Sequence, residues 1–330
     1  MQYRHPVVGW ATEVPSENRY AVDIESRPNK IFPNAKASCV SLYGDSFTFG
    51  SEVNDDEAWG NVLSGLLDCK VANYAQGGYG TDQAYLRFEL TGEVDKSPVN
   101  ILTIYPDNIL RNLNQYRPYL AGPHANWLGV KPRFIIENEE LRLIPEPSYT
   151  YDELIEASDK PETLFNHEVF LPNTANGLPR LKFPFSLTVA RFIVSKKIRN
   201  YITNTPSWIH FLEEDHPSDG LKIVNAIVQK FADLSVSRGQ TPLLVIYPTS
   251  SSYRYYKKTG IIATQPISES ALKKGIRHLD LHEPFAQYLG ERSYCEVLTM
   301  PDSCVGHYNH TGNIAVAGFI RDVLEPMLSK

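Results

Sequence analysis

The pattern of apolar and polar positions along the chain predicts strands that alternate with helices. Five short apolar runs are predicted to be buried strands, at residues 37–43, 70–74, 99–105, 241–248 and 275–281. Amphipathic segments predict helices at residues 55–67, 80–92, 219–239 and 311–327. This alternation favours an α/β fold with a five-stranded parallel sheet and helices on both of its faces.

Two regions fall outside this alternation. Residues 1–36 are rich in Pro, Asn and charge, and we expect them to form an irregular or short-strand extension before a domain at 37–330. The third and fourth strands lie too far apart for a plain crossover, so we expect an insertion at about 113–184. A hairpin is predicted at 133–144 and a helix at 186–202. Whether the insertion shapes a substrate pocket or is a surface excursion stays open.

Composition and charge exclude several classes of protein. The chain has 330 residues, a formal net charge of -6 and no block of Lys and Arg interleaved with aromatic residues, so we expect no nucleic-acid partner. No apolar run reaches membrane-spanning length, and the first ten residues lack the pattern of a signal peptide. We expect a soluble protein, cytoplasmic as the sequence stands and extracytoplasmic if a leader has been removed. The oligomeric state stays open.

Four cysteines are too few and too scattered for a disulfide scaffold or a four-thiolate zinc site. Cys39 and Cys69 lie in apolar, strand-like runs, and we expect both to be core residues. Cys295 and Cys304 are close enough in the chain to pair, and whether they do so stays open.

Polar and glycine residues follow several of the predicted strands and precede the last helix. Because parallel strands end at one edge of a sheet, these residues are expected to meet there. They are Ser46 after the first strand, Gly77, Gly78 and Gly80 after the second, Asp107 and Asn108 after the third, and His307 before the last helix.

These residue types suit acyl transfer. A serine hydroxyl becomes a nucleophile when an imidazole within hydrogen-bond reach accepts its proton, and the imidazole then protonates the leaving group. The oxyanion of the tetrahedral intermediate needs donors fixed in advance, such as backbone N–H groups and an asparagine amide. Ser46 taken alone is equally well a helix-capping serine, and His307 taken alone is an ordinary loop histidine.

The motifs resemble those of the SGNH, or GDSL-type, hydrolase family. "GDSFTFG" at 44–50 matches the first block, "NYAQGGYGTDQ" at 73–83 resembles the second, and "HYNHTGN" at 307–313 resembles the last. The resemblance implies a three-layer flavodoxin-like fold without a cofactor or metal. It also implies Ser46 as nucleophile, His307 as base, and the backbone N–H groups of Ser46 and Gly78 in the oxyanion hole.

Two departures from the family pattern concern the site. The third block usually reads G-x-N-D, whereas this chain has "YPDN" at 105–108, and we favour Asn108 over Asp107 as the amide that faces the oxyanion. The acid that orients the histidine generally lies about three residues before it, where this chain has Cys304. Asp302 is the acid we favour, and a backbone carbonyl is the alternative.

Other sites are weaker matches to the sequence. His278 and His282, with Asp280 and Glu283, offer metal-ligating side chains, but a strand followed by a turn separates the two histidines. The glycines of "GGYG" lack the spacing of a dinucleotide fingerprint and a phosphate-loop lysine. Thr48 stands where a G-x-S-x-G elbow needs its second glycine.

The sequence therefore predicts a serine esterase or deacylase. It would hydrolyse a small-molecule ester, either an O-acyl carbohydrate or a small lipid-like ester, through an acyl-enzyme on Ser46. Two alternatives stay open. One is an O-acyltransferase that uses the same residues, and the other is a catalytically silent binding protein with the same fold.

Overall fold

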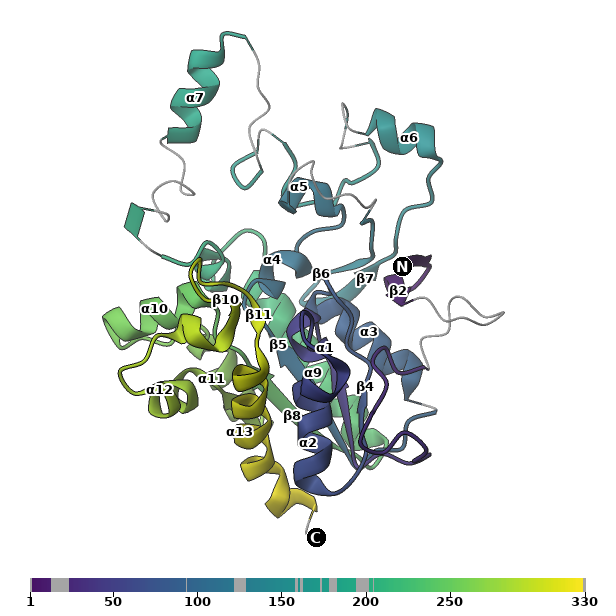
Figure 1. Ribbon diagram of the computed structural model, residues 1–330. Coiled ribbons are helices and arrows are strands. Elements are labelled where there is room, and N and C mark those ends of the chain that lie inside the picture. The colour runs from purple at the N-terminus through teal and green to yellow at the C-terminus, as the bar shows by residue number, and fades with distance from the viewer. Residues whose placement is uncertain are drawn as a thin grey trace.

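The computed structural model of the protein describes residues 2–12, 24–92, 94–121, 129–157, 160, 163–172, 174–177, 183–193, 202–203 and 205–328. Its centre is one sheet of five parallel strands in the order β4-β3-β5-β8-β9 (Figure 1). In chain order these strands are β3 (Val40–Tyr43), β4 (Val71–Asn73), β5 (Val99–Ile104), β8 (Thr241–Ile246) and β9 (His278–Asp280). The spatial order 2-1-3-4-5 is the flavodoxin-like arrangement. The fold class predicted from the sequence is thereby confirmed.

Helices cover both faces of the sheet, because neighbouring strand residues point to opposite sides. Leu42 and Ile101 belong to one apolar cluster, whereas Tyr43 and Leu102 belong to the other. The first cluster includes residues of α2 (Trp59–Leu67), α10 (Ser250–Thr259), α12 (His282–Leu289) and α13 (His310–Leu328). The second includes residues of α3 (Thr81–Thr91), α9 (Gly220–Ser237) and α11 (Gln265–Lys273). Among the described residues, no helix combines the length and the apolar character needed to cross a bilayer.

The N-terminal segment packs onto the core. A two-stranded antiparallel ribbon forms from β1 (Gln2–His5) and β2 (Gly9–Thr12). Val8 and Trp10 are buried in the same cluster as α3 and α9, and the Trp10 indole donates to Gly77 O over 3.1 Å. Residues 13–23 of the predicted extension lie outside the described residues. The division of the chain at residue 36 stays a prediction.

The segment between β5 and β8 begins with α4 (Asn108–Asn112) and α5 (Arg117–Ala121). The predicted hairpin is present as β6 (Arg133–Glu137) and β7 (Glu140–Ile144), and positive φ angles at Asn138 and Glu139 suit a two-residue turn. The remaining elements are α6 (Tyr151–Glu156), α7 (Phe185–Ile193) and the 3-10 helix η3 (Ile209–Leu212). Helix α7 covers the first half of the predicted helix at 186–202, and residues 194–201 lie outside the described residues.

Buried charges join this segment to the sheet domain. Lys131 forms an ion pair with Asp82 of α3, and both side chains are buried. The Glu168 carboxylate accepts the Gln115 N–H at 2.6 Å, the Tyr116 N–H at 3.0 Å and the Asn114 amide at 2.9 Å. Because a buried carboxylate is costly unless it is hydrogen-bonded, the Glu168 contacts hold two parts of the insertion together, whereas the ion pair of Lys131 with Asp82 joins the insertion to α3.

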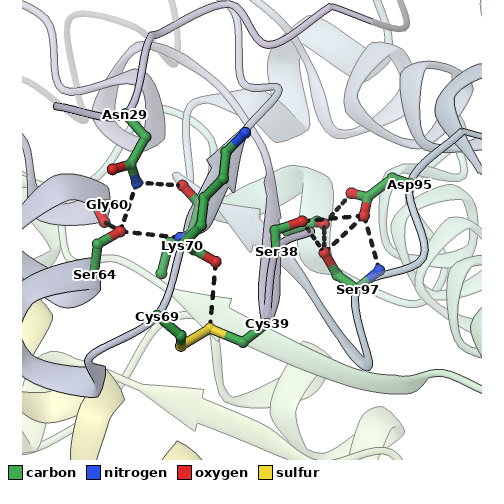
Figure 2. The surroundings of a disulfide bond; sticks show 11 residues. Asn29, Ser38, Cys39, Gly60, Ser64, Cys69, Lys70, Asp95 and Ser97 are labelled. Atoms are coloured by element: carbon green, nitrogen blue, oxygen red, sulfur yellow. Dashed lines mark hydrogen bonds between the residues drawn. A yellow bond between two sulfur atoms is a disulfide. The ribbon is translucent and has the colours of Figure 1, made fainter. Parts of the chain in front are cut away.

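All four cysteines form disulfide bonds. Cys295 pairs with Cys304, and Cys39 pairs with Cys69 (Figure 2). Cys39 and Cys69, expected in the core, are half-buried, and the sequence did not predict that they pair. Val40 lies beside Val71 in the parallel ladder, and the Cys39 N–H donates to Lys70 O over 2.9 Å. This register brings the two thiols together. It is not visible in the sequence, where the two cysteines lie in separate apolar runs.

Candidate active site

Ser46 lies where β3 meets α1 (Ser46–Phe49), a single short helical turn. Gly44 precedes it, and a Cβ at this position would collide with the hydroxyls of Thr103 and Thr48. A glycine is therefore required for the strand to end this close to β5. The Ser46 side chain is partly exposed, and no hydrogen bond to its hydroxyl is found among the described residues.

Asp45 holds this turn in place. Its fully buried carboxylate caps α1 by accepting the Phe47 N–H at 2.9 Å, and it forms a 3.2 Å ion pair with Arg111. Arg111 also donates to Tyr79 O over 2.9 Å, which ties the serine turn to the loop after β4. Asp45 is thus engaged in structural contacts.

His307 lies beside this turn. It is part of β11 (Val305–Tyr308), which pairs antiparallel with β10 (Leu298–Met300). The centroid of its ring is 4.8 Å from that of Phe47, the residue that follows Ser46. Segments 261 positions apart in the chain (307 minus 46) therefore meet at one edge of the sheet, as the motifs predict.

Glu52 is the carboxylate next to His307. Its Oε1 lies 2.9 Å from Nδ1 of the imidazole, and its Oε2 accepts the His307 backbone N–H at 3.1 Å. Oε1 is within hydrogen-bond distance of Nδ1 but poorly aligned with its N–H bond, and the contact is an ion pair only when the imidazole is protonated. The Thr299 hydroxyl also donates to Oε2. Glu52 thereby contacts both strands of the β10–β11 ribbon.

The environment of Glu52 favours its charged form. Partial burial is the largest single influence and raises its pKa, but the hydrogen bonds from Thr299 and His307 and the charge of His307 together outweigh it. The pKa of Glu52 is therefore lower than that of an ordinary glutamate. Gly306, with a φ of 91°, leaves room for this contact, because a Cβ there would lie 3.0 Å from Glu52 Oε2.

Arg27 holds the loop that carries Glu52. It is buried, and its guanidinium donates to Phe49 O over 3.2 Å and to Val53 O over 2.7 Å. Its Nε also lies 3.1 Å from Asp55 Oδ1. These contacts on both sides of Glu52 restrict the loop, so the N-terminal segment helps to place the carboxylate beside His307.

Asp302 occupies a different place from the one expected. It is exposed in the turn between β10 and β11, and no hydrogen bond or ion pair of its side chain is found in the described part of the chain. The acid next to His307 is Glu52, six positions after Ser46 and 255 before the histidine. The family pattern places the acid about three residues before the histidine. It therefore cannot predict Glu52, which lies far from His307 in the sequence.

The loop after β4 carries Gly78, whose φ of 81° favours glycine. Asn73 connects this loop to the serine turn, because its amide donates to Thr48 O over 2.9 Å and accepts the Ala75 N–H at 3.0 Å. The Gln76 N–H donates to Gly44 O over 3.1 Å. The predicted oxyanion glycine is therefore on a loop that lies directly against the Ser46 turn.

Asp107 and Asn108 differ in burial. Asn108 begins α4 with 1% of its surface exposed, and neither polar atom of its amide has a hydrogen-bond partner among the described residues. Asp107 is partly exposed. Burial, and to a lesser extent the charge of Asp45, raises the pKa of Asp107, although Arg111 opposes the shift. Which of the two faces the oxyanion stays a prediction.

A second Ser-His-acid group lies at the ends of β8 and β9. His282 Nδ1 is 2.6 Å from Asp280 Oδ1, and His282 Nε2 is 2.9 Å from Ser252 Oγ. Ser252 and His282 are fully buried, and the Ser252 hydroxyl also accepts the Thr249 N–H at 2.8 Å. Sequence reasoning missed this group, although "TSSSY" follows one predicted strand and "HLDLH" lies at the end of another.

His282 and Asp280 also belong to the set of side chains that the sequence analysis considered as metal ligands. His282 and Asp280 are used in the hydrogen-bond chain to Ser252, and the described residues contain no group of His, Cys, Asp and Glu side chains arranged to hold a metal ion. His278 instead lies within β9, with Nδ1 3.4 Å from Ile276 O.

Comparisons with known proteins give structural neighbours only. No protein-family model and no curated protein sequence matches the chain. A lipolytic protein of the G-D-S-L family from Desulfitobacterium hafniense is similar at 14% identity, covering 86% of this chain and 98% of its own, with a TM-score of 0.39. An acetylxylan esterase from Geobacillus stearothermophilus is similar at 10% identity, covering 87% and 93%, with a TM-score of 0.43. An alpha/beta hydrolase from the metagenome of Lake Arreo, Spain, is similar at 10% identity, covering 87% and 94%, with a TM-score of 0.45.

Proposed function

We propose that the chain is a serine hydrolase of the SGNH type that cleaves a small-molecule ester, with Ser46, His307 and Glu52 as its catalytic group. The observation that carries the proposal is the position of His307, between the residue that follows Ser46 and the Glu52 carboxylate. A neutral imidazole that keeps its proton on Nδ1, facing Glu52, leaves Nε2 free to accept the proton of the Ser46 hydroxyl.

The reaction follows from these roles. Ser46 Oγ attacks the acyl carbonyl as its proton moves to His307, and the imidazolium returns that proton to the departing alcohol. The backbone N–H groups of Ser46 and Gly78 and the Asn108 amide stabilise the oxyanion. Water then attacks the acyl-enzyme, again with His307 as base. Glu52 takes the part for which the sequence favoured Asp302, because it stabilises the imidazolium without accepting the proton.

The Glu52 carboxylate also weakens the case for a catalytically silent binding protein. That alternative rested on the altered third block and on the missing acid before His307. Glu52 supplies an acid from another segment, so the departure "YPDN" alone continues to support a protein without turnover. We therefore favour the enzyme.

The two disulfides support an oxidising compartment, since such bonds persist mainly outside the reducing cytosol. We therefore prefer the extracytoplasmic alternative. Mass spectrometry after alkylation without a reductant would detect no modified cysteine if both bonds are present in the native protein. Modification of all four would contradict this assignment.

A fluorophosphonate probe tests the nucleophile. We expect wild-type protein to be labelled, Ser46→Ala to be unlabelled, and the matched variant Ser252→Ala to be labelled like wild type. A panel of p-nitrophenyl esters of rising chain length, measured beside acetylated sugars, would then define the acyl and alcohol groups. Labelling that persists in Ser46→Ala would contradict the proposal.

A further inference from the structure

Helix α7 carries an apolar surface that the rest of the described structure leaves uncovered. Phe185 has 57% and Ile193 has 61% of its surface exposed, and Val189 is also exposed. Figure 1 shows α7 standing clear of the helices that pack on the sheet. A helix that belonged to the core would cover these side chains, because apolar groups of this size gain free energy on leaving water.

The apolar residues are arranged for contact with a flat surface. Phe185, Val189 and Ile193 are spaced by four, which places them along one side of the helix. Phe183, just before the helix, is the most exposed of the large apolar residues, at 88%. Leu187, on the opposite side of α7, is 51% exposed, so five large apolar residues are exposed within eleven positions. This is a concentration rather than the scattered exposure that is normal on protein surfaces, and Phe185, Val189 and Ile193 form its continuous stripe.

The charge of the surrounding sequence differs from that of the whole chain. Residues 169–212 contain none of the 38 Asp and Glu residues and six of the 32 Lys and Arg residues, although the chain as a whole has a net charge of -6. The nearest acids are Glu168 and Glu213, just outside this stretch. An apolar helix in a basic, acid-free stretch is typical of segments that lie on anionic lipid.

We propose that α7 binds the surface of an anionic phospholipid bilayer, with Phe185, Val189 and Ile193 in the boundary between headgroups and acyl chains. The positive charge of residues 169–212 would attract the lipid headgroups, and the apolar stripe would enter the interface. A partner protein or a second copy of the chain would need an acidic, apolar groove, and the described surface offers no observation in favour of one. The proposal stands apart from the esterase chemistry.

Vesicle co-sedimentation tests the proposal with the full chain. We expect binding to vesicles of phosphatidylglycerol and phosphatidylcholine in about equal parts, and little binding to phosphatidylcholine alone. Phe185→Ser/Val189→Ser should weaken binding to the anionic vesicles by about tenfold or more, since each side chain loses its apolar transfer. Added salt should also weaken binding, because the attraction between exposed charges is screened.

The matched control is Ile155→Ser/Leu272→Ser, which replaces two exposed apolar residues on α6 and α11. It should bind vesicles like wild type, and both double variants should keep the wild-type thermal midpoint. Equal binding by all three proteins would overturn the proposal, as would no binding to either vesicle. So would a dimer that is lost in Phe185→Ser/Val189→Ser, because the stripe would then serve self-association.

Discussion

The described part of the protein contains one hydrogen-bonded Ser-His-acid group, which is buried, and the group that we propose as catalytic is partly exposed. In the group of Ser252, His282 and Asp280, the contacts of the imidazole measure 2.9 and 2.6 Å, and the serine and histidine are inaccessible to solvent. In the group of Ser46, His307 and Glu52, the contact between imidazole and acid measures 2.9 Å and is poorly aligned. The imidazole there is 21% exposed and the carboxylate 40%.

The comparison shows that good hydrogen-bond geometry does not by itself make a group catalytic. A nucleophile must reach a substrate, and a fully buried hydroxyl that also contacts Thr249 cannot do so. The buried group joins α10 to the end of β9, and its close contacts satisfy polar atoms that would otherwise be costly inside the protein. In the proposed group, no hydrogen bond to the Ser46 hydroxyl is found among the described residues, which leaves the hydroxyl available to a base when substrate arrives.

The largest expected effect separates the two serines. Ser46→Ala should lower kcat by at least about 10³-fold, because the acyl-enzyme can no longer form. Ser252→Ala should keep wild-type kcat. Steady-state hydrolysis of p-nitrophenyl acetate measures both. If Ser252→Ala were inactive but folded, and Ser46→Ala active, the roles of the two groups would be reversed.

A smaller loss is expected when the acid of the exposed group is changed. Glu52→Gln should lower kcat on the order of 10²-fold, because the neutral amide no longer stabilises the imidazolium. Glu52→Asp should recover part of the activity, and Asp302→Asn should leave kcat unchanged. The pH profile of kcat distinguishes this role from a merely structural one, since loss of the carboxylate should move the histidine-dependent limb. A full loss in Asp302→Asn would restore Asp302 as the orienting acid.

Asp107→Asn should raise kcat modestly, by about tenfold or less, if Asp107 lies near the oxyanion. Burial raises the pKa of Asp107, so in wild type its carboxyl gains negative charge as the pH rises through this raised pKa. The ratio of the variant's kcat to that of wild type should therefore grow with rising pH and level off above that pKa. A ratio that does not depend on pH would place Asp107 away from the oxyanion.

The smallest effect on activity is expected for substitutions in the buried group. Such substitutions should instead lower the free energy of unfolding. Ser252→Ala leaves His282 Nε2 and the Thr249 N–H without their partner and should lower the free energy of unfolding by about 1–3 kcal/mol. Ser46→Ala, at a partly exposed site, should change it by less than about 0.5 kcal/mol. Urea denaturation measures both values. Equal stability of the two variants would contradict the structural role of the buried group.

The fold was predictable because its signals are local. Buried strands appear as short apolar runs, and their polar ends are visible in the same few residues, so the strands at 40–43 and 99–104 and the hairpin at 133–144 agree with the sequence. The motifs around Ser46 and His307 are local too, and the fold brings the β10–β11 ribbon that carries His307 to the Ser46 turn.

The sequence by itself determined the alternation of strands and helices, the candidate serine and histidine, and the basic, acid-free stretch around α7. Tertiary structure alone decided that Glu52 pairs with His307, that Cys39 reaches Cys69, and that Ser252 and His282 are sealed from solvent. The physical reason is that periodicity and capping act over a few residues, whereas these pairings depend on strand register, loop clamps such as Arg27, and the layers of helices that exclude water.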